Sequence, residues 1–99
     1  MSDREFLQVD PAVLHLPGGR RDGVDPMKLH RQVARHGMSV AGMPPLEVSR
    51  GSDGELVIND GVTRATRVAK SLPGTLVTVE VTGILPVAVG GLPTVRERL

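Results

Sequence analysis

The chain has 99 residues, and its 12 Lys and Arg against 11 Asp and Glu leave one net positive charge. This length predicts a single domain over residues 1–99, and a charge so near zero does not by itself indicate a nucleic-acid partner. The absence of cysteine excludes disulfides, thiolate nucleophiles and cysteine-ligated metal sites.

The beginning of the chain predicts a short strand and then a loop. Residues 6–9 have the composition of a strand, which Asp10-Pro11 ends. Gly and Pro punctuate residues 17–24, so this segment is expected to be a loop. Arg20 and Arg21 lie in the loop, where they are expected to be solvated, with an anion contact as the alternative.

A helix is predicted over residues 26–36. Asp25 can cap its free amide groups, Pro26 fits the first helical position, and Gly37 is a typical stop. Helical spacing places two groups of residues on separate faces. The apolar group, expected to face the core, is Met27, Val33 and Ala34. The basic group, expected to be solvated or to contact an anion, is Lys28, Arg31 and Arg35.

The middle of the chain predicts a β-hairpin over residues 46–58. Apolar and polar residues alternate from Leu46 to Arg50, residues 51–54 have the composition of a turn, and the apolar run 55–58 is the return strand. The sequence Asn59-Asp60-Gly61 is expected to break that strand.

A second helix over residues 62–71 and a β-branched strand over 76–81 are expected next. The helix has an apolar stripe that should face the core, and its members are Val62, Ala65, Val68 and Ala69. Its basic residues, expected on another face, are Arg64, Arg67 and Lys70. Residues 84–99 are expected to extend beyond a core of residues 6–82, either as a strand and turn or as a tail laid across the domain.

The junction between the return strand and the second helix is the candidate site. A helix start presents unpaired amides and a partial positive charge, and Gly61 would let a ligand approach the backbone. Thr63 can add a hydroxyl donor and Arg64 a guanidinium suited to phosphate oxygens. These residues predict an anion cradle, although Asp60-Gly61 also fits a plain turn with a helix cap.

The order of these elements resembles the ParB/sulfiredoxin superfamily. In that pattern a strand and a loop lead to a helix ending in Gly, a Pro-led strand and short hairpin, an Asp-Gly turn opening a helix, and a Val-rich strand. The matching segments here are Val9, residues 26–36, 45–48, 55–58, 60–64 and 77–79. The resemblance covers roughly residues 6–82. It implies a small α/β domain with a mixed sheet of about four strands and two main helices.

The resemblance also implies that the turn contacts nucleotide phosphates. The site residues that it suggests are Asp60, Gly61, Thr63 and Arg64, with Arg20, Arg21 and Arg67 as further anion contacts. This chain departs from the family in lacking the sulfiredoxin cysteine, so sulfinic acid repair is excluded. It also carries Val62 and Thr63 where relatives often have His, which puts family-type phosphotransfer in doubt. Because no ParB-type helix-turn-helix segment is found in the sequence, centromere binding is not expected of this chain alone.

Three functions therefore compete. The first is a nucleotide- or phosphate-binding module, regulatory in a DNA-linked or mobile-element system. The second is an interaction or assembly module, docking a protein partner or a second copy through residues 84–93. The third is a phosphotransferase or nuclease in which Asp60 acts as a base or holds a metal. DNA binding ranks last because the net charge is near zero.

Cofactor and location follow from similar arguments. Asp60 beside a phosphate would need a metal or an ordered hydrogen bond, so a nucleotide with Mg²⁺ is the candidate cofactor. The chain's histidines, His15, His30 and His36, lack metal-ligand spacing, and no resident metal site is predicted. The start of the chain does not resemble a secretory signal, and no apolar run approaches the roughly 20 residues of a membrane span. We therefore expect a cytoplasmic protein.

Overall fold

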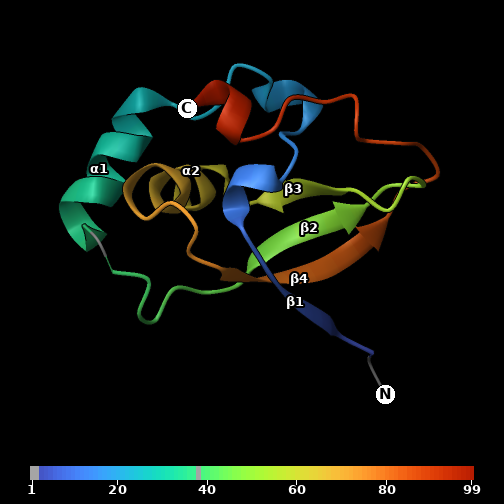
Figure 1. Ribbon diagram of the computed structural model, residues 1–99, viewed down its shortest axis with the longest axis horizontal. Coiled ribbons are helices and arrows are strands. Elements are labelled where there is room, and N and C mark those ends of the chain that lie inside the picture. Colours follow the sequence, from blue (N-terminus) through green and yellow to red (C-terminus); the bar gives the residue numbers. More distant parts are fainter. Residues whose placement is uncertain (1–2, 38) are drawn as a thin grey trace.

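The computed structural model describes residues 3–37 and 39–99, which form one small α/β domain (Figure 1). Its strands are β1 (Glu5–Val9), β2 (Leu46–Arg50), β3 (Leu56–Asp60) and β4 (Val77–Ile84), and its α-helices are α1 (Pro26–His36) and α2 (Val62–Ser71). Short 3₁₀ turns span Pro11–Val13, Gly18–Arg20 and Arg96–Arg98. The predicted fold class, a four-stranded mixed sheet with two main helices, is confirmed.

The order of strands across the sheet is β1-β4-β2-β3. β4 pairs with β1 in antiparallel fashion and with β2 in parallel fashion, while β2 and β3 form the predicted antiparallel hairpin. The chain therefore leaves β3 at one edge, passes through α2, and returns as β4 on the far side of β2. This connection places the first turn of α2 directly after the end of β3.

The core lies between α2 and the sheet. The apolar stripe of α2 is buried as predicted, because the same helical face meets the inward-facing residues of three strands. The helix contributes Val62, Ala65, Val68 and Ala69, and the strands contribute Leu46, Val48, Ile58, Val77 and Val79. Burying such aliphatic side chains is the main stabilising contribution in a chain with one aromatic residue.

Helix α1 has the predicted bounds but not the predicted packing. Asp25 Oδ1 accepts a hydrogen bond from the Met27 amide at 2.9 Å, and Gly37 ends the helix at φ +55°. However, Met27 is 63% exposed and Val33 41%, and no residue of α1 is buried. The expectation that Met27, Val33 and Ala34 face the core is wrong, because α1 packs beside α2 instead of on the sheet (Figure 1).

Two strands extend beyond their predicted ends. β3 continues to Asp60, which pairs with Glu47, and β4 continues to Ile84, which pairs with Arg50. Asn59 stays in β3 because its side chain donates to Ser49 Oγ (2.8 Å) and Thr82 Oγ1 (3.1 Å) across the sheet. Neighbouring strands thus override the weak β propensity of these residues.

The C-terminal segment belongs to the core, so the predicted core of residues 6–82 is too short. The amide of Leu16 donates to Pro93 O (2.8 Å), and the amide of Val95 donates to Leu14 O (2.9 Å). Val89 and Val95 are buried. His15 forms β-bridges to Val57 of β3 and to Thr94. The chain segments around His15 and Thr94 therefore lie along the β3 edge of the sheet. Among residues 3–37 and 39–99, neither α-helix has the length and apolarity that crossing a bilayer requires.

Candidate functional site

The turn between β3 and α2 is closed by Gly61. This residue has φ +114° and is the N-cap of α2, and no side chain caps the helix. A Cβ at this position would lie 2.5 Å from Leu46 Cδ2 and 3.2 Å from Arg64 Nη2. Gly61 is therefore required by its backbone conformation and by close packing with Leu46. The expectation that its missing side chain leaves room for a ligand is wrong, because protein atoms fill that space.

Arg64 folds back over the turn. Its Nη1 donates to the carbonyl oxygen of Pro44 at 2.8 Å, and its Nη2 lies 3.4 Å from Asp60 Oδ2. The Arg64 side chain is 17% exposed and that of Asp60 is 70% exposed. Arg64 thus fastens the loop before β2 to the start of α2, and part of its hydrogen-bonding capacity is already used. Asp60 faces solvent and forms an ion pair with Arg64 instead of capping α2.

Arg67, predicted to lie on a face other than the apolar stripe and to be a further anion contact, is buried. It is 1% exposed. Its Nη1 donates to the carbonyl oxygens of Gly37 (3.0 Å) and Ser39 (2.8 Å), and its Nε donates to Gln32 Oε1 (3.2 Å). Desolvation lowers the pKa of this guanidinium. Arg67 therefore holds the end of α1 and the loop that follows it.

Arg20 and Arg21 belong to a different part of the surface. Arg20 ends the 3₁₀ turn Gly18–Arg20, and the carbonyl oxygen of Arg21 accepts a hydrogen bond from Arg98 Nε at 2.8 Å near the C-terminus. Neither residue lines the clefts beside the β3–α2 turn. The structure thus separates Arg20 and Arg21 from the turn.

A basic cleft lies between α1 and the first turn of α2. It has a volume of about 260 Å³ and is open to solvent. We call it the basic cleft, and it is lined by Lys28, Arg31, Gln32 and Arg35 of α1 and by Thr63 of α2. The three cations share one face because they follow each other at three- and four-residue spacing. Packing of α1 beside α2 brings this face to the helix start that the sequence singled out.

The electrostatics of the basic cleft favour an anion. Three lining side chains carry positive charge, and none of its lining residues carries a carboxylate. The nearby start of α2 lacks a side-chain cap, so its first amides and the helix dipole add partial positive charge. Of the predicted site residues, the structure brings Thr63 to this cleft. The sequence marked Lys28, Arg31 and Arg35 as a basic face but could not show what that face adjoins.

Other candidate chemistry finds structural roles. Glu80 forms an ion pair with Arg4 at 2.8 Å, which lowers the pKa of Glu80. His15 is buried, and its Nδ1 donates to Leu92 O at 2.8 Å. In the part of the chain that the structure describes, no three His, Asp or Glu side chains gather in a way that could hold a metal.

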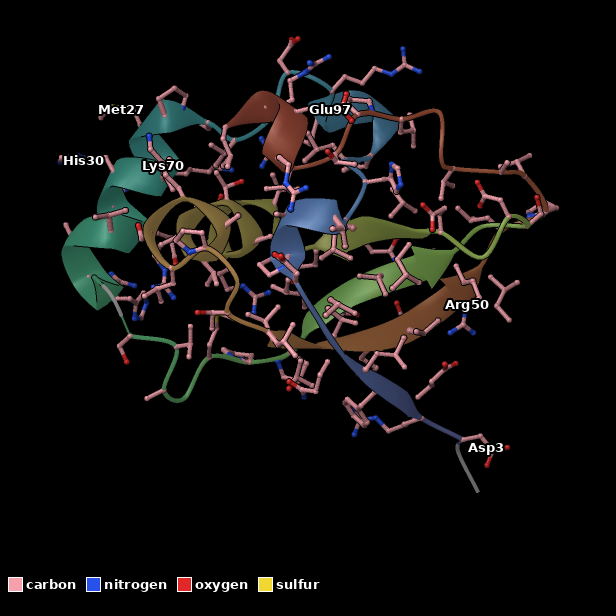
Figure 2. All side chains as sticks on the ribbon, in the orientation of Figure 1. Asp3, Met27, His30, Arg50, Lys70 and Glu97 are labelled. Carbon is pink, nitrogen blue, oxygen red and sulfur yellow. The ribbon has the colours of Figure 1, made fainter. Side chains whose placement is uncertain are left out.

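A second groove lies on the other side of the contact between the two helices. It has a volume of about 400 Å³ and is lined by Pro26, Leu29, His30, Val33, Lys70 and Ser71. Figure 2 shows His30 and Met27 on the outer side of α1, with Lys70 of α2 nearby. This groove is more apolar than the basic cleft and exposes part of Val33.

Comparisons with known proteins leave the relationship of this chain open. No protein-family model matches the sequence, and the searches of curated proteins and of solved structures give no significant match.

Proposed function

We propose that this chain is a phosphate-binding module that holds the phosphate groups of a nucleotide in the basic cleft. The observation that carries the proposal is the charge of the cleft: Lys28, Arg31 and Arg35 converge beside an uncapped helix start, and no carboxylate lines the same cleft. Guanidinium groups bind phosphate oxygens through charge-assisted hydrogen bonds, and helix starts attract the same groups. Thr63 supplies a neutral hydroxyl donor in the wall of the cleft.

The resemblance to the ParB/sulfiredoxin superfamily is part of the proposal. Its support is the succession of strand, helix ending in Gly, hairpin, Asp-Gly turn, helix and Val-rich strand, in which β1, α1, β2–β3, α2 and β4 follow one another. In this proposal the phosphates bind beside the turn, against Thr63 and the basic face of α1. Gly61 and Arg64 act by shaping the turn, and Mg²⁺ accompanies the nucleotide bound to its phosphates.

Calorimetric titration tests the proposal. ATP, ADP, CTP and GTP are titrated, with and without Mg²⁺, into the wild type and into Arg31→Ala and Arg20→Ala. Loss of one charge-assisted contact, worth about 1.5 kcal/mol, should weaken binding about tenfold in Arg31→Ala. Arg20→Ala removes the same charge from a region outside the cleft, so its affinity should equal that of the wild type.

Two results would contradict the proposal. One is a folded wild type that binds none of the four nucleotides. The other is an equal affinity for Arg31→Ala and the wild type. Arg31 is a better choice than Arg64 for this test, because Arg64 also holds Pro44 and its replacement would disturb the turn. A steep fall in affinity with salt that is the same for nucleotides and for DNA would favour the DNA alternative.

An interaction module is the second candidate, and one observation favours it. Met27 and Val33 on α1 are exposed beside the more apolar groove. The surface first considered for docking, residues 84–93, is a poorer choice because Val89 is buried in the chain's own fold and Leu92 O accepts a hydrogen bond from His15. A phosphotransferase or nuclease would need Asp60 as base or metal ligand, whereas Asp60 pairs with Arg64.

A further inference from the structure

The charge of Arg67 is not balanced by a carboxylate. Among residues 3–37 and 39–99, none of the ion pairs includes Arg67. Its guanidinium donates to two carbonyl oxygens, to the Gln32 side chain and to Met43 Sδ (3.6 Å). Carbonyl dipoles at the end of α1 offset part of this charge, but none of these partners carries a negative charge. A buried cation without a counter-ion is costly, because desolvation is not repaid by an opposite charge.

Arg67 lines a small pocket together with a second arginine. The pocket has a volume of about 70 Å³ and lies under the loop of residues 39–44. Arg64, Arg67 and His36 line it, and no lining residue is acidic. The Nη2 group of Arg67 has two N–H donors, of which one uses the thioether of Met43, a weak acceptor. Arg64 Nε has no hydrogen-bond acceptor among the residues that the structure describes.

The size of this pocket limits its ligand. A cavity needs about 10–15 Å³ to hold a buried water, and pockets that enclose drug-sized ligands start at about 300 Å³. A volume of about 70 Å³ fits one small group and excludes a nucleoside. Paired guanidinium groups match the oxygens of a tetrahedral oxyanion, which can accept several N–H bonds at once.

We propose that the pocket between Arg64 and Arg67 binds one small tetrahedral oxyanion, phosphate or sulfate, as the counter-ion of buried Arg67. This site is separate from the basic cleft, although Gln32 lines both. The bound oxyanion links the two arginines of α2 to the loop of residues 39–44. Since it binds the folded chain, it stabilises the fold by mass action.

The experiment uses a chain whose basic cleft has lost both of its arginines, the double variant Arg31→Ala/Arg35→Ala. In this background Ala41, an exposed residue on the pocket wall, is changed to Asp or to Asn. The two new side chains are nearly the same size, but Asp places a fixed negative charge where the oxyanion would bind. Melting temperatures are compared in sodium phosphate, sodium sulfate and sodium chloride at equal ionic strength.

In the Ala41→Asn variant, near-saturating phosphate should raise the melting temperature by at least about 4 °C over chloride. In the Ala41→Asp variant the rise should disappear, because the carboxylate takes the place of the counter-ion. Phosphate and sulfate also stabilise proteins in general by exclusion from the surface, so an equal rise in both variants overturns the proposal. No rise in either variant overturns it as well.

Direct binding is measured on the double variant without a change at Ala41, by ³¹P NMR titration with inorganic phosphate. Saturable binding with one phosphate per chain is expected, and its absence rejects the oxyanion site whatever the Ala41 variants do. Because this background lacks the arginines of the basic cleft, failure here leaves the nucleotide proposal intact. Equally, failure of the nucleotide titrations does not affect this result.

Discussion

The two ends of the molecule differ in how completely they are packed. At one end, α1 lies beside α2 with Met27 and Val33 exposed. At the opposite end in Figure 1, the β2–β3 turn meets the C-terminal segment. We call this region, residues 14–16, 51–55 and 87–95, the C-terminal clasp. Both ends carry apolar residues in the sequence, so the difference shows that burial depends on the available partner surface and not on composition.

Polar contacts close the C-terminal clasp. Asp53 accepts hydrogen bonds from the amides of Gly90 (2.8 Å), Glu55 (3.2 Å) and Val89 (3.3 Å). His15 adds its bond to Leu92 O. Arginines make the corresponding contacts at the α1 end, where Arg67 and Arg64 bind loop carbonyls and leave positive charge facing small clefts. The comparison thus indicates that the clasp contributes more to stability, whereas the proposed ligand sites lie at the α1 end.

The largest effect should come from a buried valine of the clasp. Val95→Ala removes a side chain that is 1% exposed, and the lost transfer free energy and the resulting cavity should lower the free energy of unfolding by about 2–3 kcal/mol. Val33→Ala makes the same chemical change at a position 41% exposed on α1, and should cost less than about 0.5 kcal/mol. Urea denaturation measures both. Equal losses would abolish the distinction between the two ends.

A smaller effect is expected at the turn that opens α2 at the α1 end. Gly61→Ala should cost about 2 kcal/mol, because it combines a positive φ with a contact to Leu46 Cδ2 that must be relieved. The matched control is Gly74→Ala, which has φ +85° and open space around it, so backbone strain alone should cost about 1 kcal/mol. Thermal denaturation of both variants separates packing from strain. A smaller loss for Gly61→Ala than for Gly74→Ala would contradict the packing argument.

The smallest effect concerns the pH dependence of the clasp. The Gly90 amide, followed by other backbone amides, lowers the pKa of Asp53 below its ordinary value of 3.8. A carboxyl group with a lowered folded pKa contributes stability above its unfolded pKa, and loses that contribution as the pH falls through the folded pKa. Asp53→Asn should therefore be less stable than the wild type near neutral pH, and urea denaturation across pH should show the difference shrinking below about pH 4. A difference that stays constant with pH would exclude the ionised carboxylate as its source.

The sequence predicted most elements of the fold because their signals are local. The ends of α1 are set by Asp25, Pro26 and Gly37. The apolar stripe predicted on α2 is the face that the structure buries. The ends of the strands were predicted less accurately, because Asn59 and Gly83 have weak strand propensity. Gly83 pairs with Ser49 of β2, and the Asn59 side chain donates to the Ser49 hydroxyl. Local sequence could not reveal those partners.

For the candidate site, the sequence predicted the glycine turn that opens α2 but not the contacts of the residues around it. The sequence suggested Arg67 as an anion contact but could not show that carbonyls from the end of α1 and the loop after it hold its side chain in the interior. Arg31 and Arg35 are exposed, as predicted, but the sequence could not show that the packing of α1 beside α2 places them with Thr63. These differences all depend on contacts between segments far apart in the chain.

The sequence by itself determined the fold class, the bounds of α1 and α2, and the existence of a glycine turn at the start of α2. These depend on caps, periodicity and backbone conformation, which act over a few residues. Only the tertiary structure decided that residues 87–95 complete the core, that Arg67 is buried, and that three cations of α1 face Thr63. The physical reason is that burial and electrostatic environment are set by the neighbours that a side chain meets in space, which its own sequence context does not specify.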